Sequence, residues 1–343
     1  MVQQQRSTLA LEDLGSSGTV PGVLAVSSQR SVPQQNSTLG NRGLLETATQ
    51  QPFPVWRGRM DRKYGLSYFT PYIVYSSRPP ASLRQFIVDP TNPSSRQPVM
   101  HVDFPQGSYS TSSDIPGGTL LYAYPMGNGV PIAYYGATLE YDVYFPPDFP
   151  FNKGGKLPGL GGGPRGCGGG ADPISCWSVR LMWRREGAGE AYMYVPEGQQ
   201  GADFCDQPPY TDCNYAWGVS LARGSFYFTP GSWHRMALTV RMNDVGQANG
   251  SVEVKLNGKR KLYYDQVNYR TKPGIQVDSI YYCTFFGGND ATWAPPHDTY
   301  LLFKNVRIYS LDPPSITTSV DPPSAATVQV AVTLPLQDEE PRY

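Results

Sequence analysis

Short runs in which hydrophobic and polar residues alternate recur through the middle of the chain. They lie at residues 139–145, 236–242, 252–256, 279–286 and 299–309. Alternation with a period of two is typical of β-strands that bury one face. The pair Asn257-Gly258, directly after the third run, predicts a two-residue hairpin turn. The last run changes parity midway, which a β-bulge would explain.

A further pair of runs, within residues 176–196, predicts a hairpin with one hydrophobic and one polar face. The hydrophobic face carries Val179, Leu181, Trp183, Ala191, Met193 and Val195. The opposite face carries Ser178, Arg180, Met182, Glu190, Tyr192 and Tyr194. A turn centred near Gly187 would pair Arg180 with about Tyr194, and Met182 with about Tyr192. A slip of one residue would reverse the faces of a strand, so the two polar sets are expected on one surface.

That surface has two interpretations. Polar residues that alternate with hydrophobic ones on a strand are most often solvated. However, tyrosine rings can cover the apolar faces of sugars, and an arginine can hold a carboxylate through two parallel hydrogen bonds. Arg180 flanked by Tyr192, Tyr194 and Ser178 is therefore a candidate sugar platform.

Residues 151–163 are rich in glycine and predict an irregular loop instead of a strand or a helix. The loop lacks the G-x-x-x-x-G-K-[ST] pattern of a phosphate-binding loop. Its glycines would let the backbone approach a ligand closely, with Lys153 or Lys156 projecting toward it. The alternative is a flexible surface loop with solvated lysines.

Composition supports an all-β fold. Of 343 residues, 36 are Gly, 33 are Pro and 24 are Tyr, and helices tolerate Gly and Pro poorly whereas aromatic residues favour strands. Many short strands separated by turns indicate two packed antiparallel sheets, as in a sandwich or jelly roll. Basic and acidic residues balance at 28 each, which argues against a nucleic-acid partner. No hydrophobic run approaches the roughly 20 residues of a membrane-spanning helix.

The chain divides into three parts by composition. Residues 1–50 are predicted to be a flexible leader, residues 51–312 the β-domain, and residues 313–343 a disordered tail. The N-terminus lacks the hydrophobic core of a secretory signal, so a signal either has been removed or is not used.

Five cysteines are present. Cys167 and Cys176, and likewise Cys205 and Cys213, are spaced closely enough for two local disulfides, although four cysteines allow three pairings. Cys283 would remain as a buried thiol. No C-x-x-C pair occurs and the three histidines are scattered, so a zinc site is not expected.

Several of these segments together resemble polysaccharide lyase family 14, which contains alginate and glucuronan lyases of chlorella viruses, molluscs and fungi. The resemblance covers roughly residues 50–312. It rests on Lys-Gly-Gly-Lys-Leu-Pro-Gly-Leu at 153–160, Ser-Val-Arg-Leu-Met-Trp-Arg at 178–184, Gly-Ala-Gly-Glu-Ala-Tyr-Met-Tyr-Val-Pro at 187–196, Thr-Pro-Gly-Ser-Trp at 229–233, Leu-Asn-Gly at 256–258, Thr-Phe-Phe-Gly-Gly at 284–288 and Asp-Thr-Tyr-Leu-Leu-Phe-Lys at 298–304.

The resemblance implies a β-jelly roll and a set of functional residues. The implied catalytic residues are Lys156, Ser178, Arg180, Tyr192 and Tyr194. Lys153, Glu190, Met182 and His297 are the further candidates for substrate contacts, and His297 stands where a lysine is commoner in the family.

The implied reaction is β-elimination on a 1,4-linked polyuronate, first alginate and its mannuronate-rich blocks, then glucuronan. Arg180 would neutralise the sugar carboxylate without a metal or other cofactor. Lys156 would be the base if its pKa is depressed, with Tyr192 or Tyr194 as acid, although a tyrosine base remains open. Ser178 would position the substrate. These residues are expected in one concave groove of a secreted monomer whose partner is an acidic polysaccharide. The rival hypothesis is a non-catalytic carbohydrate-binding jelly roll.

Overall fold

The computed structural model of the protein describes residues 79–312, except 96, 112, 128 and 164–166. It also describes the backbone of three short strands nearer the N-terminus, β1 (Gly58–Arg59), β2 (Tyr68–Phe69) and β3 (Tyr72–Tyr75). The predicted leader at 1–50 and the predicted tail at 313–343 lie outside the described residues. No described helix has the length and hydrophobicity needed to cross a membrane.

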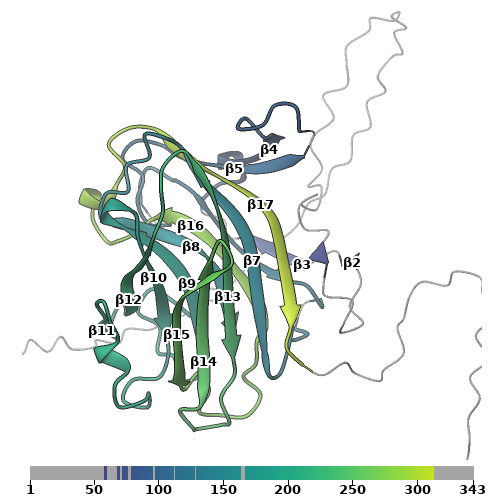
Figure 1. Ribbon diagram of the computed structural model, residues 1–343, viewed down its shortest axis with the longest axis vertical. Coiled ribbons are helices and arrows are strands. Elements are labelled where there is room, and N and C mark those ends of the chain that lie inside the picture. The colour runs from purple at the N-terminus through teal and green to yellow at the C-terminus, as the bar shows by residue number, and fades with distance from the viewer. Residues whose placement is uncertain are drawn as a thin grey trace, which may run out of the picture. The chain divides into compact units, whose positions relative to one another are not determined.

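Two antiparallel sheets pack face to face and enclose one hydrophobic core (Figure 1). Among the described residues, the first sheet has eight strands in the order β11 (Asp212–Asn214), β12 (Gly218–Tyr227), β10 (Ala188–Tyr194), β9 (Trp177–Arg184), β8 (Gly154–Gly162), β16 (Ser279–Phe286), β6 (Thr119–Tyr124) and β3. The second has seven in the order β15 (Lys259–Val267), β14 (Gly250–Leu256), β13 (Ser232–Arg241), β7 (Gly136–Phe145), β17 (Thr299–Ser310), β5 (Pro98–Phe104) and β4 (Arg84–Val88). The predicted all-β fold of two packed sheets is confirmed.

Only short 3-10 helices interrupt the described strands. They are η3 (Ala81–Leu83), η4 (Arg185–Gly187), η5 (Phe204–Asp206) and η6 (Ala291–Trp293). η4 forms the turn between β9 and β10, and η6 lies in the connection between β16 and β17.

The period-two pattern identified the inward faces correctly. Every member of the hydrophobic set on β9 and the following hairpin strand is buried in the core: Val179, Leu181, Trp183, Ala191, Met193 and Val195. Around Trp183, Phe104 and Phe286 pack at ring-centroid distances of 6.3 and 5.3 Å, both edge to face. Burying these large side chains supplies the main free-energy gain that holds the two sheets together.

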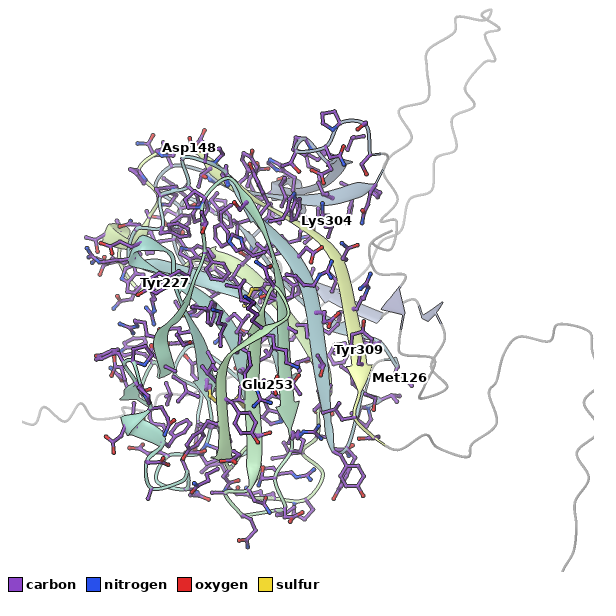
Figure 2. The ribbon with its side chains drawn as sticks, in the orientation of Figure 1. Met126, Asp148, Tyr227, Glu253, Lys304 and Tyr309 are labelled. Carbon is purple, nitrogen blue, oxygen red and sulfur yellow. A yellow bond between two sulfur atoms is a disulfide. The ribbon has the colours of Figure 1, made fainter. Side chains whose placement is uncertain are left out.

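The predicted bulge in the last strand is also present. The pairing of β17 with β7 shifts between Lys304 and Arg307, and Asn305 has a positive φ of 54°. Lys304 and Tyr309 lie on either side of this irregularity (Figure 2). Because one extra residue is inserted, the strand keeps an inward hydrophobic face before and after the bulge.

The prediction of an irregular loop at residues 151–163 is wrong for most of its length, because Gly154–Gly162 form β8 in the middle of a sheet. The glycines serve a packing purpose here. A Cβ at Gly155 would lie 2.1 Å from the ring of Trp183, and one at Gly162 would lie 2.4 Å from Nε1 of Trp177. Glycine therefore leaves room for two tryptophans of β9, and the strand is buried along its whole length.

Both local disulfides are present. Cys167 is bonded to Cys176, and Cys205 to Cys213, while Cys283 is a buried free thiol. The structure thus selects one of the three pairings that the sequence left open. The first disulfide closes the segment that precedes β9.

Candidate active site

Three neighbouring strands, β8, β9 and β10, carry the five candidate catalytic residues on the face that points away from the core. All five side chains are almost completely buried. The exposed fractions are 8% for Lys156, 0% for Ser178, 2% for Arg180, 8% for Tyr192 and 4% for Tyr194. The structure therefore brings the predicted set together, but the residues are not solvated as outward-facing strand residues usually are.

The register of the hairpin differs from the prediction by two residues. Arg180 pairs with Tyr192, and Met182 pairs with Glu190. The reason is the turn, which is centred on Glu186 instead of Gly187, with Glu186 in the left-handed region at φ 57°. Moving the centre by one residue changes each partner by two, so the faces stay as predicted.

Arg180 is a buried cation whose hydrogen-bonding capacity is largely unused. Its Nη1 lies 3.7 Å from the sulfur of Cys283, and its guanidinium carbon lies 4.5 Å from the centroid of the Tyr281 ring. Nε and Nη2 have no hydrogen-bond partner within the part of the chain that the structure describes. A buried charge without a partner is costly, so the arrangement suits an anion that supplies the missing acceptors.

Lys156 lies between Met182 and Tyr192. Its Nζ is 2.9 Å from Sδ of Met182 and 3.6 Å from the centroid of the Tyr192 ring. Burial, reinforced by the positive charges of Arg180 and Arg184, holds the pKa of Lys156 well below its ordinary value. The amine is therefore biased toward its neutral form, which is the form that can accept a proton.

The two tyrosines share one acceptor. The hydroxyl of Tyr192 and that of Tyr194 both donate to the backbone oxygen of Trp217, the latter at 2.6 Å. Their rings meet edge to face at 5.9 Å. Burial and the neighbouring Tyr194 raise the pKa of the Tyr192 phenol. Tyr192 therefore keeps its proton at neutral pH and is suited to donate it.

Backbone from two other parts of the chain lies against this face. The backbone of Cys167 accepts a hydrogen bond from Ser178 Oγ at 2.7 Å, and the Gly169 N–H donates to the Tyr194 hydroxyl at 2.8 Å. On the other side, Gly218 lies so close to the tyrosines that an added Cβ would be 2.9 Å from either ring.

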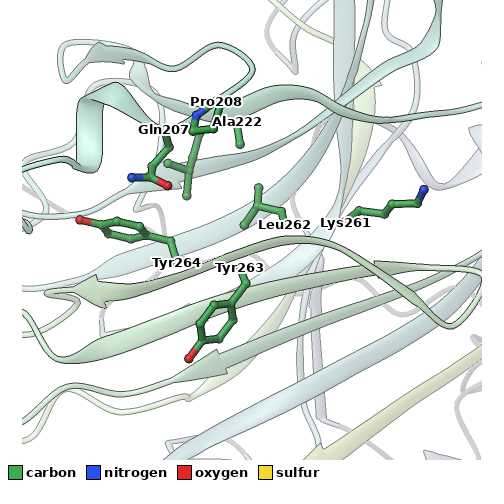
Figure 3. Close-up of a pocket in the computed structure, with 8 residues that line it drawn as sticks. Gln207, Pro208, Ala222, Lys261, Leu262, Tyr263 and Tyr264 are labelled. Carbon is green, nitrogen blue, oxygen red and sulfur yellow. The ribbon is translucent and has the colours of Figure 1, made fainter.

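Two cavities in the described part of the chain lie away from these residues. One of about 210 Å³ is lined by β12, β15 and Gln207 (Figure 3). Another of about 370 Å³ lies on the seven-stranded sheet beside Trp233 and Arg235. Neither cavity is lined by a predicted site residue.

Glu190, predicted to contact substrate, is fully buried and fully engaged. One of its oxygens lies 2.6 Å from Nη2 of Arg184, and the other lies 2.7 Å from Nε of Arg223. The Ser220 hydroxyl donates to it at 3.1 Å. The geometry favours a supporting role for Glu190 over the direct substrate contact that the sequence suggested.

The other predicted contact residues differ in position. Met182 is buried against Lys156. Lys153, directly before β8, donates to the Thr292 hydroxyl and is partly exposed. His297 is exposed before β17, where its Nδ1 lies 3.0 Å from the backbone oxygen of Asp298.

Sequence reasoning missed several neighbours of the set. Arg184 and Tyr281 could have been predicted, because each alternates with core residues along its strand and therefore points to the same side as the candidate site. The backbone oxygen of Trp217 and the close approach of Gly168, where a Cβ would lie 3.1 Å from Nη2 of Arg180, have no sequence signal because they depend on tertiary structure.

Comparisons with known proteins identify the family of the chain. The family model described as polysaccharide lyase 14 matches residues 92–306. The crystal structure of the marine PL-14 alginate lyase from Aplysia kurodai is 33% identical with a TM-score of 0.58, and the match covers 66% of this chain and 87% of that one. Alginate lyase vAL-1 from Chlorella virus is 21% identical with a TM-score of 0.56, over 70% of this chain and 92% of that one, and this likeness concerns the fold alone.

A curated relative is much longer. Exolysin of Paramecium bursaria Chlorella virus 1 is 24% identical over 197 residues. The match covers 51% of this chain but only 29% of Exolysin, so the chain spans less than a third of the length of that relative.

Proposed function

The chain belongs to polysaccharide lyase family 14, and on that premise we propose that it cleaves a 1,4-linked polyuronate, alginate or polymannuronate, by metal-independent β-elimination. The observation that carries the proposal is the buried Arg180 guanidinium next to Lys156 and Tyr192. Two of its nitrogens have no hydrogen-bond partner among the described residues. A carboxylate is the group that matches such a guanidinium best, because it accepts two parallel hydrogen bonds and neutralises the charge.

Arg180 would act on the sugar carboxylate. The proton on C5 becomes acidic only when the negative charge that develops on the adjacent carboxylate is stabilised. Arg180 remains charged at any working pH and lies in a site of low polarity, where its electrostatic effect is strong. Ser178 would help to position the substrate next to it.

Lys156 and Tyr192 would move the protons. The neutral amine of Lys156 takes the C5 proton, the electron pair left on C5 forms the C4–C5 double bond, and the bond from C4 to the glycosidic O4 breaks. Tyr192, whose raised pKa keeps it protonated, gives its proton to O4. The products are one fragment with a new reducing end and a second fragment that carries a 4,5-unsaturated uronate at its non-reducing end, without a covalent enzyme intermediate. Tyr194 would hold the loop backbone at Gly169.

The proposed place of action is outside the cell. The structure contains two disulfides, and disulfides persist mainly in oxidising environments. An extracellular acidic polysaccharide is the substrate that such a location would provide.

The test is an assay of purified protein on polymannuronate, polyguluronate and glucuronan, read by the ultraviolet absorbance of the unsaturated uronate. We expect absorbance to rise with at least one polymer and to be unaffected by EDTA. Binding of a polymer without any absorbance would instead support the non-catalytic carbohydrate-binding function. Loss of activity on chelation, restored by added calcium, would contradict the metal-free mechanism.

A further inference from the structure

A partly exposed tryptophan lies beside the buried site. Trp293 ends the short helix η6, and the Nζ of Lys153 lies 5.8 Å from the centroid of its ring. The guanidinium carbon of Arg184 lies 5.9 Å from the same ring and also 5.9 Å from the ring of Tyr192. Arg184 therefore connects the candidate catalytic residues with an aromatic surface that the proposed reaction does not use.

The position of Trp293 is well defined. Its ring lies against the backbone of Gly288, where an added Cβ would be 2.2 Å from the indole. Asp290 caps η6 by accepting from the Thr292 N–H at 2.8 Å, and the Asn152 side chain donates to the Ala294 oxygen at 2.7 Å. An aromatic ring fixed in this way loses little conformational entropy when a ligand stacks on it.

The cations beside Trp293 are also held in place. Glu190 binds the guanidinium of Arg184 through Nε at 2.8 Å, and the Ser220 hydroxyl accepts from Nη2 of the same residue at 2.8 Å. Because Glu190 is shared with Arg223, two positive charges face one negative charge in this cluster. Asp290, bonded to Thr292, is the acidic group on the Lys153 side. A net positive charge therefore remains next to an apolar ring.

We propose that Trp293, Arg184 and Lys153 form a second sugar subsite, which binds the uronate unit next to the one that is cleaved. This inference rests on the proposed lyase function. The indole covers the apolar face of the sugar ring, and the two cations attract its carboxylate. The subsite increases affinity for polymer and for longer oligosaccharides, while the chemical step remains with Lys156, Arg180 and Tyr192.

The test compares Trp293→Ala and Lys153→Gln with the control Tyr263→Ala, which removes an aromatic residue that is 46% exposed on β15 of the other sheet. We expect Trp293→Ala to raise KM for polymer about tenfold, equivalent to about 1.4 kcal/mol, with kcat within about twofold of wild type. Lys153→Gln should raise KM less and weaken its dependence on salt. Tyr263→Ala should change neither constant.

Unchanged KM in both Trp293→Ala and Lys153→Gln would overturn the subsite while leaving the lyase function intact. A wild-type protein without unsaturated product would instead contradict the proposed function. In that case affinity electrophoresis in gels containing polymannuronate still tests the subsite, because Trp293→Ala should then lose retardation relative to Tyr263→Ala. Equal retardation of the two variants would overturn it.

Discussion

The amine of Lys156 lies directly over the ring of Tyr192, with Nζ 3.6 Å from the ring centroid. The two residues come from strands that do not pair with each other, since β9 lies between β8 and β10. Burial acts on both groups and favours their neutral forms: the pKa of Lys156 falls and the pKa of Tyr192 rises. A neutral amine beside a protonated phenol is the pair that an elimination needs.

The first prediction concerns pH. A base works only when it is unprotonated, so kcat/KM should rise as pH passes upward through the lowered pKa of Lys156. Lys156→Met should lose about 10²–10⁴-fold in activity, the contribution typical of general acid–base catalysis. Lys261→Met, which removes an exposed lysine of β15, should keep the wild-type pH profile. If the activity of Lys156→Met begins to rise at the same pH as that of wild type, Lys156 is not the base.

The same lowered pKa has a consequence for stability. The unfolded chain binds a proton at Lys156 up to about pH 10.4, whereas the folded chain releases it at lower pH. The free energy of unfolding of wild type should therefore increase with pH between these two values. Lys156→Met should lack this part of the increase and be the more stable protein on the acidic side. Urea denaturation at several pH values measures the free energy of unfolding of both proteins. If the two free energies change with pH in parallel, the pKa of Lys156 is not lowered in the folded protein.

The face of each strand could be read from the sequence, but the register could not. Alternation placed Arg180, Tyr192 and Ser178 on one surface because the side-chain period of a strand is two. Their pairing depends on where the turn is centred, and Glu186 adopts a positive φ that a residue of its type seldom takes. Nothing in the pattern distinguishes a centre at 186 from one at 187.

Two other features could not be predicted because they depend on residues distant in sequence. β8 resembled a loop because the space beside its glycines is filled by residues of neighbouring strands, among them two tryptophans of β9, which the local sequence does not reveal. The burial of the site depends on loop backbone at Cys167 and Trp217, whose carbonyl oxygens are the same in every residue type. Local propensity is overridden in both cases by tertiary packing.

The second prediction separates function from stability at Arg180. Arg180→Met should lower kcat/KM by at least about 10²–10³-fold, the effect of removing one charge-stabilising donor. It should not lower the melting temperature, because two nitrogens of this buried guanidinium lack partners in the described structure. The matched control is Arg270→Met. Arg270 is equally buried but donates to the backbone oxygens of Asn243 and Ile275, so its loss should cost about 1–3 kcal/mol. A large loss of stability in Arg180→Met would place Arg180 in a structural network.

The third prediction concerns Glu190. Glu190→Gln keeps the shape of the side chain but leaves Arg184 and Arg223 without the negative charge that they share. Because this ion-pair network is buried, the free energy of unfolding should fall by on the order of 3 kcal/mol. Glu253→Gln is the control, because Glu253 pairs with the more exposed Lys255 and Arg260, and surface pairs contribute about 0–1 kcal/mol. Chemical denaturation measures both losses. Unchanged stability of Glu190→Gln together with a raised KM would support the direct substrate contact instead.

The last prediction concerns Gly218, the first residue of β12, which lies against the rings of the two tyrosines. Its φ of 104° is unfavourable for any residue with a Cβ, and that Cβ would lie 2.9 Å from the rings of Tyr192 and Tyr194. Gly218→Ala should therefore lose stability, by about 1–3 kcal/mol, and also lose activity, because the rings must move. Gly246→Ala is the matched control: its φ of 78° imposes comparable strain, but an added Cβ meets nothing within 4 Å. It should lose stability only. Full activity in Gly218→Ala, measured on folded protein, would show that the ring positions are not critical for turnover.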